Sequence, residues 1–290
     1  MRKPLCLILG ITLLCLAACG TGCEPLSGDP ADSTSVDMSI SQPALPAGAE
    51  PFVGEDGQAL TQPAPMLTEI VTVVIPEGFT FFQVALRLEA NGVCSAADFT
   101  AAAQSYQIQS FYAPISPQSC YRMEGMLFPD TYEFYMGEDP VAVLRKMLNN
   151  YAEKTGLPDY DTLILASIIE RETRSDEHMA MVSSVFHNRL AINMKLQADA
   201  TRAYVRDHIK EDPLVENPER FGELYNTYQC PALPPGPICS PGLRAIEAAQ
   251  NPAQSDFFYY FFGKDETNHY NYTYEEHSAG IEKYGLGLPE

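Results

Sequence analysis

The stretch from Leu163 to Thr173 constrains the fold of this chain more than any other segment. The seven residues before Glu170 are apolar apart from Ser167, so a helix formed by them has almost no polar face. Such a helix is stable only when other elements bury it nearly all round, and it therefore predicts a folded domain built around it. Two glutamates, Glu170 and Glu172, stand at its end.

Either glutamate is a candidate general acid. The end of an apolar helix disfavours a carboxylate, through desolvation and through the helix dipole, and so raises the pKa of the carboxyl group. Helical spacing places Glu170 on the face of Ala166 and Ser167, whose small side chains leave room for a ligand, and this favours Glu170. Glu172 lies on the opposite face and is open to pairing with an arginine. The alternative for both is an ordinary surface glutamate at a fraying helix end.

Composition excludes several classes of function. The chain has 290 residues, 46% of them hydrophobic, which is enough to bury a core. Its 18 Lys and Arg residues against 38 Asp and Glu residues give a net charge of −20, which argues against a nucleic-acid partner. The sequence contains no HExxH, no GxSxG and no phosphate-binding glycine loop, so we expect no metal and no cofactor.

The N-terminus has the pattern of an export signal. Arg2 and Lys3 precede an apolar run, Leu5–Ala18, that is shorter than the ~20 residues of a membrane-spanning helix. This predicts a signal peptide over residues 1–18. The run ends in Leu-Ala-Ala-Cys and resembles a bacterial lipobox, which implies lipid attachment at Cys19. We therefore expect a lipoprotein anchored to the extracytoplasmic face of the cell membrane.

Residues 19–65 are expected to form the lipid anchor and a disordered tether. From residue 20 to residue 65 there is no Lys or Arg, and there are seven prolines and seven acidic residues. Such a composition cannot bury enough apolar surface to offset the entropy of ordering.

The folded part is predicted to be α+β and to consist of two domains. In the first, residues 66–123, a strand over Ile70–Ile75 precedes two short helices that begin after Thr80 and Ser95. This small module resembles LysM-like glycan-binding modules, and the alternative is a structural cap. In the second, residues 124–290, the patterns predict helices and then two aromatic strands; the expected elements are Val141–Thr155, Tyr160–Thr173, Asp176–Met194, Pro241–Gln250, Phe257–Phe262 and His269–Tyr274.

Six short motifs follow one another in the larger domain. They begin with Glu124-Gly125 and Phe128–Tyr132 and continue through Ala166–Thr173. The others are Val185–Leu190, Leu196–Thr201, Tyr225–Tyr228 with Leu233–Ile238, and His269 with Glu276-His277. In this order they resemble the motifs of the endolytic murein transglycosylases of the YceG-like family. Ala198, Ala200 and Pro231-Ala232 depart from the family pattern, which affects loop details.

The resemblance implies an enzyme that cuts peptidoglycan glycan strands between MurNAc and GlcNAc, with Glu170 as the catalytic acid and a 1,6-anhydro-MurNAc product. It also suggests nascent strands as the substrate and peptidoglycan synthases as partners. A polar set of residues is expected to line the saccharide groove: Asn188, Gln197, Asp199, Thr201, Tyr225, Asn226 and Thr227. Helix capping by Asn188 and a turn closed by Asn226 are the alternatives.

The cysteines left after export suggest crosslinks. Cys230 and Cys239 bracket a proline-rich loop, and a disulfide between them suits an exported protein. Cys94 and Cys120 are a second pair within the small module.

Two other classes of function compete with the enzyme. The first is a non-catalytic lipoprotein that binds cell-wall glycan. The second is a solute-binding lipoprotein, which would need two similar α/β lobes that the sequence does not suggest.

Overall fold

The computed structural model describes residues 69–106, 116–173, 175–230 and 232–285. These residues belong to one compact unit, Pro63–Glu290. The signal peptide, the lipidation site at Cys19 and the tether were predicted for residues outside the described part of the chain. Among the described helices, none is both long enough and apolar enough to cross a membrane.

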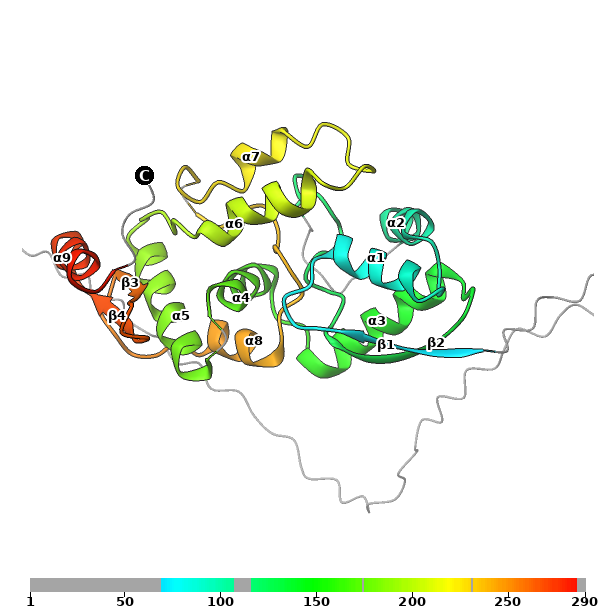
Figure 1. Ribbon diagram of the computed structural model, residues 1–290, viewed down its shortest axis with the longest axis horizontal. Helices are drawn as coiled ribbons and strands as arrows, with labels where there is room; N and C mark the ends of the chain where they lie inside the picture. The colour runs from blue at the N-terminus through cyan, green and yellow to red at the C-terminus, as the bar shows by residue number, and fades with distance from the viewer. Residues whose placement is uncertain (1–68, 107–115, 174, 231, 286–290) are drawn as a thin grey trace, which may run out of the picture. The chain divides into compact units, whose positions relative to one another are not determined.

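The first elements form a strand-helix-helix-strand arrangement (Figure 1). Strand β1 (Ile70–Ile75) pairs antiparallel with β2 (Asp130–Tyr135). Helices α1 (Phe81–Ala90) and α2 (Ala96–Ser105) lie between them in the chain. Thr80 begins α1 with a capping box, and Ser95 caps α2, as the sequence predicts.

The pairing of β1 with β2 joins residues on both sides of the domain boundary predicted between residues 123 and 124. Strand β2 pairs with β1 along all six residues, so the small module is completed by a segment assigned to the larger domain. One hydrophobic core runs from Val73 in β1 to Ala249, near the end of the following helical region. The structure therefore joins the two predicted domains in one packed unit.

Helix α4 (Tyr160–Glu172) is the buried helix that the apolar stretch predicts. It packs against α5 (Asp176–Ala191), α6 (Asp199–Tyr204) and α8 (Leu243–Gln250) (Figure 1). Every residue from Leu163 to Glu170 is buried. Helix α3 (Pro140–Thr155) also packs on α8 and on α2.

The polar stretch between α5 and α8 contains short helices that the sequence patterns did not predict. Helix α6 continues into a π-helical turn, η1 (Val205–Ile209), and α7 (Arg220–Leu224) follows. The chain ends in the β3 (Tyr259–Phe262) and β4 (Asn268–Asn271) hairpin and helix α9 (Tyr274–Tyr284). Helix α9 packs on both strands of this hairpin.

Candidate active site

The two glutamates at the end of α4 lie in different surroundings. Glu170 is 9% exposed, and its Oε2 accepts a hydrogen bond from the backbone N–H of Gly242 at 3.1 Å. Gly242 is the N-cap of α8, which no side chain of its own caps. The Glu170 carboxylate therefore caps the N-terminus of a neighbouring helix, where the helix dipole favours a negative charge.

The space expected beside Glu170 is filled by the chain itself. Ser167 is fully buried, and its hydroxyl accepts a hydrogen bond from the N–H of Ile238 at 3.0 Å. The thiol of Cys239 donates to the Ser167 carbonyl at 3.3 Å. The small side chains on this face of α4 thus let the segment before α8 approach closely.

Glu172 lies on the opposite face, at the wall of two cavities. Tyr260 donates a hydrogen bond from its hydroxyl to Glu172 Oε2 at 2.8 Å. Burial raises the pKa of the Glu172 carboxyl group above its ordinary value, and the negative charge of Asp199 adds to that rise. The hydrogen bond from Tyr260, the backbone of Ala200 and the charge of Arg189 oppose it. The net direction favours a protonated carboxyl group, which a general acid requires.

The larger cavity, which we call the groove, has a volume of about 1040 Å³. Its lining runs from Glu172 and Asp199 to the hairpin and α9, and it includes several aromatic rings: Tyr228, Tyr259, Tyr260, Phe261 and Tyr274. A second cavity of about 500 Å³ shares Glu172 and Asp199 with the groove. Rings combined with a few polar groups are the usual lining of a saccharide site.

Arg189 supports the wall of the groove. It is buried, and its guanidinium donates to the carbonyls of Phe258 and Leu196, both at 2.6 Å. The same group lies over the ring of Tyr259, 5.2 Å from its centroid. One buried cation therefore ties α5 to the hairpin and to the loop before α6 while contributing positive charge near Glu172.

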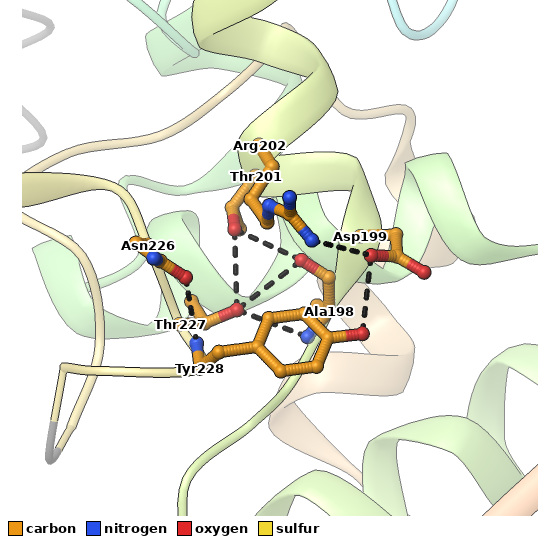
Figure 2. A network of polar contacts seen from close by, with 7 residues as sticks. All are labelled: Ala198, Asp199, Thr201, Arg202, Asn226, Thr227 and Tyr228. Carbon is orange, nitrogen blue, oxygen red and sulfur yellow. Dashed lines mark hydrogen bonds and ion pairs between the residues drawn. The ribbon is translucent and has the colours of Figure 1, made fainter. Parts of the chain in front are cut away.

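Asp199 is held at the groove by two partners (Figure 2). The Tyr228 hydroxyl donates to Asp199 Oδ1 at 3.1 Å, and Arg202 Nη1 lies 3.8 Å from the same oxygen. Arg202 also lies over the Tyr228 ring, 5.5 Å from its centroid. The carboxylate is consequently fixed in orientation beside Glu172, the other carboxyl group that lines both cavities.

Thr201 and Thr227 are buried within the chain and do not line the groove. Both are fully buried, and their hydroxyls are 3.1 Å apart. Thr227 Oγ1 accepts from the N–H of Ala198 at 2.9 Å, and Thr201 donates to the Ala198 carbonyl at 2.9 Å (Figure 2). Their hydroxyls are satisfied within the chain, and neither residue is among those that line the groove, so their predicted contact with substrate stays a prediction.

The other predicted lining residues also fall into two groups, those bonded within the chain and those that line the groove. Tyr225 is fully buried, and Asn226 accepts the N–H of Tyr228 in a turn. Asn188 donates its amide hydrogens to the carbonyls of Ser255 and Phe257, so it anchors the segment before β3. Only Gln197 and Asp199 of the predicted set line the groove.

The predicted disulfide between Cys230 and Cys239 is absent from the structure, where both are thiols. Each sulfur has its own carbonyl partner: Cys230 contacts Leu224 at 3.1 Å, and Cys239 contacts Ser167 on α4. Cys94 and Cys120 are also thiols.

The sequence analysis missed the contribution of the C-terminal hairpin and α9. Tyr260 bonds to Glu172, and Tyr274 and His277 line the groove. The sequence signals for this part are the density of aromatic residues between positions 257 and 274, which predicts strands, and the motif that contains Glu276-His277.

The chain is similar in sequence to proteins of one known family. A model of the YceG-like family matches residues 56–283. An endolytic murein transglycosylase of Bacillus subtilis (strain 168) is 34% identical over 173 residues, covering 56% of this chain and 48% of that protein. The corresponding protein of Streptococcus pneumoniae serotype 2 (strain D39) is 27% identical over 248 residues, covering 74% and 45%. The chain thus spans about half the length of the curated relatives it matches.

A solved structure also resembles this fold. The 2.6 Å crystal structure of a YceG-like protein from Listeria monocytogenes superposes with a TM-score of 0.59 at 28% sequence identity. The match covers 72% of this chain and 75% of that one. The mixed helical and small-sheet architecture is therefore shared with a YceG-like protein.

Proposed function

Because the chain belongs to the YceG-like family, we propose that it is an endolytic murein transglycosylase that cleaves peptidoglycan between MurNAc and GlcNAc. The observation that carries this proposal is a carboxyl group of raised pKa, Glu172, on the wall of a large groove lined by aromatic rings. A glycan strand can lie along such a groove with its glycosidic oxygen at the acid.

Glu172 is the general acid that the geometry favours, and Glu170 is the acid that the sequence and the family resemblance favour. Glu172 lines both cavities, whereas Glu170 is buried and bonded to the N-cap of α8. The two assignments share one chemistry and differ in which face of α4 receives the substrate.

The reaction needs one carboxyl group used twice. Protonated Glu172 donates its proton to the glycosidic oxygen, and the bond to MurNAc C1 breaks with an oxocarbenium-like transition state. The resulting carboxylate accepts the proton of the MurNAc C6 hydroxyl as that oxygen bonds to C1. The products are a new GlcNAc end and a 1,6-anhydro-MurNAc end, and no water is consumed.

The position of Asp199 makes hydrolysis a second candidate reaction. It lies on the same cavities as Glu172, and a glycosidase that uses water needs a second carboxylate. Its contacts with Tyr228 and Arg202 hold the Asp199 carboxylate in place, but both contacts use its Oδ1 atom. The lyase reaction remains the first candidate because of the relatives' activity.

The cellular setting is proposed from sequence. A lipid at Cys19 and the tether would place the enzyme outside the cell membrane, close to nascent strands and the synthases that make them. The sequence resemblance of the small module to LysM-like modules suggests that this part of the chain binds glycan.

Turnover of purified glycan strands by isosteric variants tests the assignment of the acid. Glu172→Gln is expected to lower kcat by about 10²–10⁴-fold, because it removes general acid catalysis while preserving the shape of the side chain. Glu170→Gln is the matched control on the same helix. Loss of activity in Glu170→Gln alone would identify Glu170 as the acid. Undiminished activity in both variants would refute the one-acid mechanism.

A further inference from the structure

The second cavity at Glu172 differs chemically from the groove. Three arginines line it, Arg171 at the end of α4 and Arg202 and Arg206 on α6 and η1, and no aromatic ring is among its lining residues. The whole chain has only 11 arginines and a net charge of −20, so this gathering of cations is local. A cationic cavity on an acidic protein indicates an anionic ligand.

The arginines retain donors for such a ligand. In the described part of the chain, Arg171 directs Nη1 to the carbonyl of Gly78 at 3.4 Å, and Arg202 lies 3.8 Å from Asp199. Arg206 donates through Nε and Nη2 to Asp207, at 2.5 and 2.6 Å. A guanidinium has five N–H groups, so each arginine has donors beyond these contacts.

The position of the cavity identifies which part of a substrate can enter it. The groove and the cavity meet at Glu172 and Asp199, so a group attached to the sugar at Glu172 can extend into the cavity while the strand stays in the groove. In peptidoglycan, that sugar is MurNAc, which carries a peptide on its lactyl group. The stem peptide has free carboxylates, and paired N–H groups of arginine match a carboxylate in geometry and charge.

We propose that Arg171, Arg202 and Arg206 bind the carboxylates of the stem peptide on the MurNAc residue that is cleaved. The inference rests on the proposed cleavage of peptidoglycan and adds a specificity: strands that carry peptides are better substrates than bare glycan. Arg206 is the most suitable residue to change, because its side chain is 71% exposed and contributes nothing to the buried core.

The test compares two substrates and two charge-removing variants. Glycan strands with stem peptides, and the same strands after an amidase has removed the peptides, are cleaved at low salt by the wild type, by Arg171→Gln/Arg206→Gln and by the control Arg145→Gln. Arg145 is an exposed residue of α3 and does not line the cavity. Thermal melting of all three proteins verifies that they are folded.

We expect the double variant to lose about tenfold in kcat/KM on peptide-bearing strands, as two solvent-screened contacts suggest, with little change on bare strands. The control is expected to behave like the wild type. Equal loss on both substrates, or no loss on either, would overturn the inference. A third substrate, strands that end in a lipid pyrophosphate, separates a phosphate from a carboxylate as the anion: loss on that substrate alone would also overturn the inference.

A binding measurement separates this inference from the proposed reaction. Calorimetric titration with a disaccharide that carries the stem peptide, and with the peptide-free disaccharide, needs no turnover. Weaker binding of only the peptide-bearing ligand to the double variant supports the inference even if the wild type cleaves neither strand, an outcome that would refute the proposed function. Identical binding of both ligands to both proteins refutes the inference alone.

Discussion

Replacing Glu170 with alanine should destabilise the protein, because this carboxylate caps α8 from another helix. The substitution leaves the N–H of Gly242, now 3.1 Å from Glu170 Oε2, without its buried acceptor. An unsatisfied buried donor costs about 1–3 kcal/mol, and each lost buried methylene costs about 0.8 kcal/mol. The free energy of unfolding should therefore fall by about 3 kcal/mol, which corresponds to roughly 6–12 °C in Tm for a unit of this size.

Urea titration and thermal melting of Glu170→Ala and Glu170→Gln measure this effect. Glutamine retains an oxygen acceptor for the same N–H group, so Glu170→Gln should lose less than about 1 kcal/mol and should retain turnover. The reasoning would be refuted if Glu170→Ala were as stable as the wild type. It would fail equally if Glu170→Gln were fully folded but inactive, because the carboxyl group would then be needed for chemistry.

Three further predictions follow from the site and its supports. Thr227→Val should lower the free energy of unfolding by about 1–3 kcal/mol, since it strands the N–H of Ala198; unchanged urea midpoints would contradict this. Tyr260→Phe removes a hydrogen bond that lowers the pKa of Glu172. The alkaline limb of the pH–rate profile, where the acid loses its proton, should therefore move to higher pH. A limb that stays in place or moves to lower pH would argue against Glu172 as the acid. Burial raises the pKa of Glu124 from 4.5 to about 7, so the folded state retains a proton that the unfolded state has lost. Through this group, stability should fall by on the order of 3 kcal/mol as pH rises across that window. Glu124→Gln should reduce the fall in melts between pH 4.5 and 8 by about that amount, and an unchanged fall would contradict the assignment to Glu124.

Helices with strong local signals were predictable from the sequence. The capping residues Thr80 and Ser95 begin α1 and α2, and the apolar stretch from Leu163 forms the central helix. These elements depend on contacts within a few residues, which the sequence displays directly. Strand β2 is not among the predicted elements, because Pro129-Asp130 at its start favours a turn and only two residues that follow, Tyr132 and Phe134, alternate as buried positions.

The choice between the two glutamates could not be made from α4 alone. Helical spacing indicates that Glu170 and Glu172 lie on opposite faces, but it does not indicate what covers each face. The small residues beside Glu170 accommodate the chain near Ile238, and the groove opens on the side of Tyr260. Both neighbours are about 70 or more residues away in sequence, so their placement depends on tertiary packing.

The lining of the groove was predictable only in part, for a related physical reason. Short motifs mark residues that shape a site as strongly as residues that contact substrate. Thr201 and Thr227 fix the loops that they join through buried hydroxyls, while the exposed Asp199, two residues before Thr201 in the chain, lines both cavities. Burial, which separates the two roles, follows from the assembled fold.

Digestion of peptidoglycan in H₂¹⁸O, followed by mass spectrometry of the released fragments, tests the central claim most directly. If one carboxyl group cleaves the strand without water, every new MurNAc end should have the mass of the 1,6-anhydro form and contain no ¹⁸O, and Glu172→Gln should release almost no fragments. Reducing MurNAc ends that contain ¹⁸O would show that water attacks C1, and wild-type product yields from Glu172→Gln would show that the acid lies elsewhere.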